Sequence, residues 1–213
     1  MQITNEPNLS FMDGFKPYVI DTLIEGVLIA KKSIEECNVD VKIGFGSVPE
    51  GEKTLPNFWK DLVKKGGNEF IRAVDYVGHN FYVDVFEKPL NINEVTSSVE
   101  NLLQKFRNEI LALNGFPSSL PIRITENGWP TGKNPFIQLE RSYDQQVKVI
   151  ETIRTIYHIH QQLNITHYEF FRLRDANSSK DDLFHQFGLM KDDYTPKPAY
   201  YTFKHLIDEL SLK

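Results

Sequence analysis

The chain has 213 residues, of which 40% are hydrophobic and 25% are charged, a composition typical of a soluble globular protein. That length predicts one domain, or at most two small ones. The formal net charge of -5 and the lack of a basic cluster argue against a nucleic-acid partner. No apolar run approaches the length of a membrane span, so no membrane partner is expected either.

Cys37 is the only cysteine, which excludes an internal disulfide and a cysteine metal cluster. We expect its side chain to be buried or half-buried, as a small hydrophobe. The histidines show no spacing typical of a metal site, and the sequence predicts no metal and no cofactor. The first residues are not a signal peptide. The protein would be cytoplasmic if Met1 is its natural start, and secreted if an upstream signal has been lost, so localisation stays open.

Short β-like runs alternate with longer helical patterns along the chain. The β-like runs cover residues 2–4, 39–45, 74–85, 121–125 and 166–173. The helical patterns cover residues 14–37, 57–71, 93–113, 140–163 and 198–210. Two glycines, Gly66 and Gly67, interrupt the second helical pattern. Strands that alternate with helices of this length indicate an α/β protein with five βα units and a parallel sheet.

Two glutamates follow predicted strands directly. Glu6 lies in the segment Thr4-Asn5-Glu6-Pro7-Asn8 after the first strand, and Glu126 lies in Ile124-Thr125-Glu126-Asn127-Gly128-Trp129-Pro130 after the fourth. In parallel α/β folds, side chains at the carboxyl ends of strands line the active face. Either glutamate alone has an ordinary alternative, such as an exposed loop acid. Two of them at matching strand ends favour a catalytic pair.

Both segments resemble a known group of enzymes. Asn5-Glu6-Pro7 and the segment from Ile124 to Gly128 resemble the two signature motifs of clan A glycoside hydrolases, and the second is similar to that of family 1 β-glycosidases. The resemblance implies a (β/α)8 TIM barrel, with Glu6 at the end of strand four as general acid/base. It also implies that Glu126, at the end of strand seven, is the nucleophile. Two βα units separate the two motifs, as that placement demands.

The strand between the motifs, residues 75–82, resembles the sixth strand of the clan. This implies that Tyr82 donates a hydrogen bond to Glu126, although a tyrosine here also suits a core position with a satisfied hydroxyl. His79 and Asn80 on the same strand are candidate substrate contacts. Asn5 would hydrogen-bond the sugar 2-hydroxyl, as the clan pattern implies. Its alternative role is to form a turn before Pro7.

Residues 169–175 resemble the eighth strand, where the clan places an aromatic platform for the sugar. Phe171 lies nearest that position in the sequence. A role in plain core packing is an equally good interpretation of this residue. Trp129 is a second candidate platform because it follows the nucleophile motif. The expected substrate is a carbohydrate, either a β-glycoside or a β-glycan, and the sequence does not name the sugar.

The implied mechanism is double displacement with retention, in which the two carboxyl groups lie only about 5–5.5 Å apart. Glu126 would attack the anomeric carbon while Glu6 protonates the leaving oxygen. Glu6 would then deprotonate the water that releases the sugar.

The strand before Glu6 begins at residue 2, so the resemblance implies a barrel truncated to about five βα units, with residues 1–213 as a single partial catalytic domain. Two open strand edges would favour a partner, either a second copy in a homodimer or an N-terminal chain that completes the barrel. One hypothesis is a glycosidase that needs the missing strands for activity. Another is a catalytically inactive barrel remnant that serves as a binding or assembly module. A third is an unrelated α/β protein whose motifs match by chance.

Overall fold

A computed structural model describes residues 1–12 and 16–211. Its internal contacts divide the chain into two units. Unit 1 comprises Met1–Phe81, Leu103–Thr125 and Gln162–Tyr168. Unit 2 comprises Tyr82–Leu102, Glu126–Gln161 and Glu169–Lys213. Both units are therefore built from segments that are distant in the sequence, and each is described below by itself.

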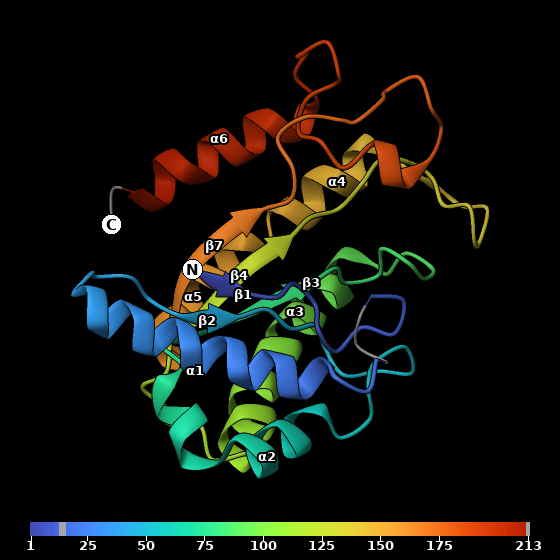
Figure 1. The fold of residues 1–213 in the computed structure, drawn as a ribbon. Helices are drawn as coiled ribbons and strands as arrows, with labels where there is room; N and C mark the ends of the chain where they lie inside the picture. The colour runs from blue at the N-terminus through green and yellow to red at the C-terminus, as the bar shows by residue number, and fades with distance from the viewer. Residues whose placement is uncertain (13–15, 212–213) are drawn as a thin grey trace. The chain divides into compact units, whose positions relative to one another are not determined.

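A five-stranded parallel sheet with the order β1-β2-β3-β4-β7 is the centre of unit 1 (Figure 1). The strands are β1 (Gln2–Ile3), β2 (Gly44–Phe45), β3 (Tyr76–Phe81), β4 (Ile122–Asn127) and β7 (Ile165–Phe170). The last two residues of β4 and of β7 belong to unit 2. The strands follow one another in sequence order and are connected through helices, which confirms the predicted α/β class with five βα units.

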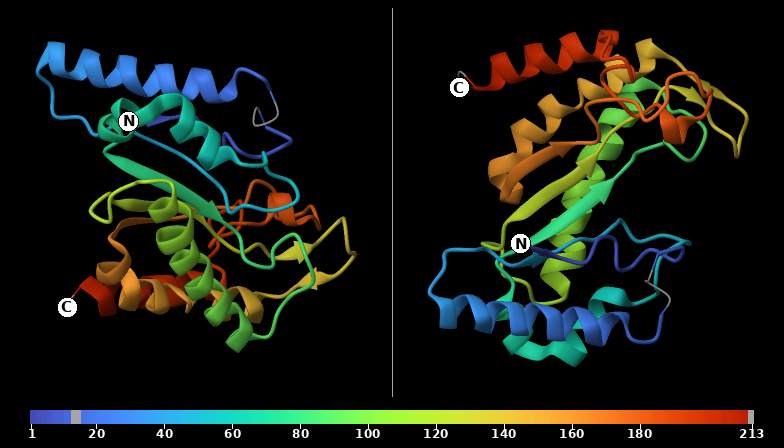
Figure 2. Two further views of the ribbon diagram at one scale, coloured as in Figure 1. Left: turned by 90° about the horizontal axis from the view of Figure 1, so that it is seen from below. Right: turned by 45° about the horizontal axis from the view of Figure 1, so that its top comes forward.

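Two long helices cover unit 1: α1 (Val19–Cys37) and α2 (Phe58–Ala73). They pack side by side, and α1 also contacts β1 and β2 (Figure 2). The helical pattern expected from residue 14 begins at Val19, and Gly14 lies outside the described residues. In α2 the predicted interruption is present at Gly67, whose φ of 59° and ψ of -162° are non-helical.

Aromatic side chains fill the core of unit 1. The indole of Trp59 is 1% exposed. Its ring lies within 6.0 Å, centroid to centroid, of four phenylalanine rings: Phe45, Phe58, Phe106 and Phe116. Because these phenylalanines come from β2, α2 and the segment before β4, this cluster ties the sheet to its helical cover.

Unit 2 holds most of the other helical residues and a small hairpin. Its elements are most of α3 (Ile92–Lys105) and α5 (Ile153–Leu163), all of α4 (Tyr143–Ile150) and α6 (Pro198–Ser211), and the antiparallel pair β5 (Gly132–Lys133) and β6 (Glu140–Arg141). Helix α4 packs against α6. A buried cluster of Val85, Trp129, Leu183 and Phe187 forms part of the core of unit 2. Within the described residues, no helix is long and apolar enough to cross a bilayer.

The single helix expected over residues 140–163 is wrong. Ser142 adopts an extended conformation and its side chain accepts a hydrogen bond from Gln145 N–H, so α4 begins only at Tyr143. Thr152 then interrupts the helical pattern, because its hydroxyl and its N–H both donate to the carbonyl of Val149. The helical spacing of apolar residues continues through both positions, so the sequence pattern alone does not show where these local hydrogen bonds interrupt the helix.

Two predicted strands are much shorter than expected, and one predicted helix changes its form. The run over residues 39–45 pairs only at Gly44–Phe45. Before it, Ile43 N–H donates to the side chain of Asp75 instead of to a strand. The run over residues 74–85 is a strand only from Tyr76 to Phe81. The helix expected over residues 93–113 ends as a π-helix at Phe106–Leu111.

The expectation for Cys37 is also wrong, because its side chain is exposed. Cys37 is the last residue of α1, and Asn38 ends the helix in a left-handed conformation with φ of 51°. The buried face of α1 is formed by residues nearer its start, such as Leu23 and Val27, both fully buried.

Candidate active site

The loop after β1 carries Glu6 in an uncommon backbone conformation. Thr4 and Glu6 have φ values of 65° and 48°, in the left-handed region that residues other than glycine rarely adopt. The buried side chain of Asn8 holds the loop: its Nδ2 donates to Val48 O at 2.8 Å and its Oδ1 accepts from Val48 N–H at 3.0 Å. The segment after β2 therefore fixes the backbone that presents Glu6.

Asn80 joins the first motif to the end of β3 within unit 1. Its Nδ2 donates to Glu6 Oε1 at 3.0 Å and to Asn5 Oδ1 at 3.1 Å. The Thr125 hydroxyl donates to Asn80 Oδ1 at 2.6 Å, which sets the orientation of the buried amide. The structure thus brings together Asn5, Glu6 and Asn80, which were predicted separately as site residues. Asn80 contacts the carboxylate of Glu6 directly.

His79 lies in the interior of unit 1 with 1% of its surface exposed. Its ring stacks on Phe106 at 3.7 Å between centroids, and Nδ1 lies 2.9 Å from Ser47 Oγ. Burial lowers the pKa of His79 to about 3, because a charged imidazole would lose its hydration there. His79 is therefore neutral at physiological pH, and its contact with a substrate stays a prediction.

Glu126 lies in unit 2 near the end of β4, inside the strand rather than after it. The Tyr82 hydroxyl donates to Glu126 Oε2 at 2.6 Å. This is the hydrogen bond that the resemblance implies. Tyr82 is the first residue after β3, and its ring packs against the core of unit 2, so its hydroxyl is held rigidly toward the carboxylate.

Phe171 directly follows β7 and is partly exposed. Its ring makes edge contacts with Tyr82 at 6.0 Å and with Phe187 at 5.4 Å between centroids. The backbone also approaches closely here, because a side chain on Gly128 would lie only 2.0 Å from the carbonyl oxygen of Phe171. Phe171 therefore lies against Tyr82, the residue that holds Glu126, and part of its ring packs in the core.

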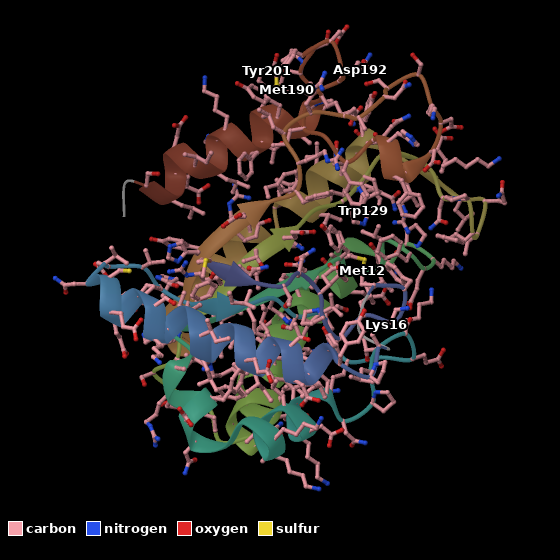
Figure 3. The ribbon with its side chains drawn as sticks, viewed as in Figure 1. Met12, Lys16, Trp129, Met190, Asp192 and Tyr201 are labelled. Atoms are coloured by element: carbon pink, nitrogen blue, oxygen red, sulfur yellow. The ribbon has the colours of Figure 1, made fainter. Side chains whose placement is uncertain are left out.

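Trp129, which is labelled in Figure 3, lies after β4. Only 1% of its surface is exposed. Its indole N–H donates to Asp84 Oδ1, and the guanidinium of Arg141 lies 4.7 Å from its ring centroid. Burial raises the pKa of Asp84, while the hydrogen bonds from Trp129 and the Leu90 N–H and the charge of Arg141 oppose that rise. The interior position makes Trp129 a support for the loop after β3, and its role as a sugar platform stays a prediction.

Sequence reasoning missed four residues that position these groups: Asn8, Asp84, Thr125 and Arg141. Asn8 and Thr125 lie inside the two motifs, so their closeness in sequence to Glu6 and Glu126 could have predicted a role in positioning them. Asp84 and Arg141 are 57 positions apart, and no local pattern connects them.

Glu6 belongs to unit 1 and Glu126 to unit 2, so the pairing of the two carboxylates stays a prediction. Within the described part of the chain, no group of three His, Cys, Asp or Glu side chains is arranged to hold a metal ion.

No family model and no curated protein matches this chain. Solved structures do match. An endo-laminarinase from Formosa Hel1_33_131 has a TM-score of 0.71 at 17% identity, over 98% of this chain and 57% of that one. A glycoside hydrolase family 17 β-1,3-glucanosyltransferase from Rhizomucor miehei has a TM-score of 0.60 at 15% identity, over 93% and 61%. A β-glucuronidase from Faecalibacterium prausnitzii has a TM-score of 0.61 at 15% identity, over 96% and 30%.

These proteins are glycosidases with TIM-barrel folds, and at such low identity the similarity shows the fold alone. The predicted fold class is confirmed: the chain is an α/β protein with a five-stranded parallel sheet, and its fold is similar to part of a TIM barrel. Its fold is similar to part of the fold of these glycoside hydrolases. The chain spans about 57–61% of the length of the laminarinase and the glucanosyltransferase, and 30% of the glucuronidase.

Proposed function

We propose that this chain carries the catalytic residues of a retaining glycoside hydrolase that acts on β-1,3-linked glucan. The observation that carries the proposal is the 2.6 Å hydrogen bond from Tyr82 to Glu126 at the end of a strand in a glycosidase fold. A carboxylate that accepts a hydrogen bond from a fixed phenol has a set orientation, as a nucleophile in an active site needs.

Each named side chain has a part in the proposed reaction. Glu126 attacks the anomeric carbon, and Tyr82 keeps its second oxygen in place. Glu6 protonates the leaving oxygen and then deprotonates water, and retention requires it to lie about 5–5.5 Å from Glu126. Asn80 holds the Glu6 carboxyl and the Asn5 side chain, which leaves the Asn5 amide group to meet the sugar 2-hydroxyl. Phe171 is partly exposed, with the guanidinium of Arg172 4.8 Å from its ring centroid, and would contact the sugar with the part of the ring that stays uncovered.

The proposed substrate comes from the similar structures. One is an endo-laminarinase, and an active-site mutant of the Rhizomucor miehei β-1,3-glucanosyltransferase was solved in complex with laminaritriose. A transfer of the glycosyl unit to another sugar instead of water would use the same covalent intermediate. The family 1-like sequence around Glu126 makes simple β-glucosides a second class of substrate to assay.

We also propose that hydrolysis requires a polypeptide that pairs with the sheet edges. Among the described strands, β1 pairs only with β2, and β7 lies at the other end of the order. Exposed backbone donors and acceptors at such edges favour pairing with a further strand. The occupant would be an N-terminal chain that continues the barrel, or a second copy of this chain.

The test is an assay on laminarin and on aryl β-glucosides. The chain is measured alone, then with a polypeptide that supplies preceding barrel units, and its mass in solution is determined by light scattering. Proton NMR of the first product identifies its anomer. Release of the β-anomer supports the proposal. Release of the α-anomer, or no turnover in any arm, overturns it and favours a binding or assembly module.

Replacing Tyr82 by phenylalanine removes only the hydroxyl that holds Glu126. A hydrogen bond to a charged group contributes about 1.5–3 kcal/mol, so we expect kcat to fall roughly 10- to 100-fold with little change in KM. Steady-state kinetics on laminarin-derived oligosaccharides, with the polypeptide that pairs with the sheet edges present, measure the effect. The exposed Tyr201 on α6, changed to phenylalanine in the same way, is the matched control and should leave kcat unchanged. An unchanged kcat in Tyr82→Phe would show that this hydrogen bond does not contribute to catalysis.

A further inference from the structure

Unit 2 exposes three phenylalanines that contact one another. Phe86, Phe136 and Phe184 are 40%, 67% and 46% exposed. The ring of Phe184 lies 6.1 Å from that of Phe86 and 6.0 Å from that of Phe136, centroid to centroid. They come from three separate segments: the loop after β3, the hairpin between β5 and β6, and the short 3-10 helix Leu183–His185. Large apolar rings gathered at the surface from distant segments are typical of a binding surface rather than of chance exposure.

These rings continue inward to the candidate nucleophile. Phe86 lies 6.2 Å from the ring of Tyr82, and Tyr82 in turn lies 6.0 Å from Phe171 and donates to Glu126. All of these contacts lie within unit 2 and fall in the range of ring-to-ring packing, 4.5–7 Å. An unbroken series of aromatic side chains therefore extends from the exposed Phe136 to the tyrosine that holds Glu126.

Hydrogen bonds also hold the backbone that carries the exposed rings. The buried Asn134 accepts a hydrogen bond from Phe136 N–H at 2.8 Å and donates to Val85 O at 3.1 Å, so it joins the hairpin to the loop of Phe86. Phe184 N–H donates to Asp182 Oδ1 at 2.8 Å. A preorganised surface loses less conformational entropy when a ligand binds.

We propose that Phe86, Phe136 and Phe184 form a stacking platform for further glucose units of a β-1,3-glucan chain, next to the site of Glu126. The proposal deepens the proposed function and rests on it for the identity of the sugar. A β-linked glucose ring has axial C–H groups on both faces and equatorial hydroxyls at its rim. Such a ring covers an aromatic face with its C–H groups while its hydroxyls reach water or nearby polar side chains. The rings of Phe86 and Phe184 are inclined by 28°, whereas Phe136 meets Phe184 edge-on at 89°, so the three rings face more than one direction. Such a group of rings suits several linked sugar units better than a single sugar.

The test measures binding by the full chain carrying Glu126→Gln, so that no ligand is consumed. Calorimetry compares laminaribiose with laminarihexaose before and after the double change Phe136→Ala and Phe184→Ala. We expect the Kd for the hexaose to rise roughly tenfold, on the scale of losing an anchoring aromatic, while the Kd for the biose stays the same. Phe184→Tyr, which keeps the ring, should retain hexaose binding, and Tyr201→Ala on α6 is the exposed aromatic control (Figure 3).

An unchanged hexaose Kd in the double variant, or an equal loss for biose and hexaose, overturns the platform. Phe136→Ala alone, at the most exposed of the three positions, provides the same comparison if the double variant does not fold. This readout is independent of turnover. Loss of hydrolysis in the Tyr82 and Glu126 variants tests the proposed function, whereas length-dependent binding tests the platform, so the two fail separately.

Discussion

Replacement of Glu126 by alanine, in the chain assayed with the polypeptide that pairs with its sheet edges, is expected to lower kcat on laminari-oligosaccharides by roughly 10⁴- to 10⁶-fold, the scale seen when an enzyme loses its nucleophile. Without the carboxylate no covalent glycosyl intermediate forms. Azide is small enough to occupy the space that the side chain vacates, and it can attack the anomeric carbon directly. We therefore expect added azide to restore turnover of an aryl β-glucoside with a good leaving group and to give the α-glycosyl azide, which NMR identifies.

Glu6→Ala is the informative comparison, because a general acid/base contributes less, about 10²- to 10⁴-fold. This variant should hydrolyse substrates with poor leaving groups very slowly, whereas the glycosylation step with a dinitrophenyl leaving group needs no proton. Azide should then give the β-glycosyl azide, since it replaces water in the second step. Glu36→Ala, at an exposed position of α1, is the control. The assignment of the two roles fails if both variants give the same azide product.

Replacement of Asp175 by alanine is expected to have the largest effect on stability. Lys197 Nζ donates to Asp175 Oδ1 at 2.7 Å, and both side chains are 0% exposed. Asp175 also accepts from Gly188 N–H at 2.8 Å and from Ser178 Oγ at 2.9 Å. Burial lowers the pKa of Lys197, and the hydrogen bond and charge of Asp175 oppose this. Removal of the carboxylate leaves a buried ammonium without its counter-charge.

Breaking such a buried pair costs about 3–5 kcal/mol in the free energy of unfolding. In a chain of this size that lowers Tm by roughly 6–20 °C, which thermal denaturation followed by circular dichroism would measure. The double change Asp175→Leu and Lys197→Met removes both charges and should recover most of the loss, since replacing an entire buried pair by apolar residues is often neutral. Asp208→Ala, at an exposed position of α6, should change the free energy of unfolding by less than about 0.5 kcal/mol. A Tm for Asp175→Ala equal to that of the control would contradict this account.

The sequence by itself determined the order and the type of the elements. Apolar periodicity separated strands from helices, and the alternation predicted a parallel sheet that the structure confirms. Periodicity could not show where local hydrogen bonds end an element. The hydroxyls of Ser142 and Thr152 divide the expected long helix, and the carboxylate of Asp75 takes the N–H that would have extended β2. Cys37 is exposed because the buried face of α1 does not reach the end of the helix. The helical pattern alone does not show where along α1 packing against the rest of the protein stops.

For the site, the motifs around Glu6 and Glu126 and the strand that ends at Tyr82 were all readable from the sequence. The hydrogen bond from Tyr82 to Glu126 is present as the resemblance implies. Only the tertiary structure joined Asn80 to Glu6, placed Trp129 in the interior against Asp84 and Arg141, and gathered Phe86, Phe136 and Phe184 at one surface. The physical reason is range. A motif reports what a few neighbouring residues can do, whereas burial and side-chain contact depend on segments that are tens of residues apart.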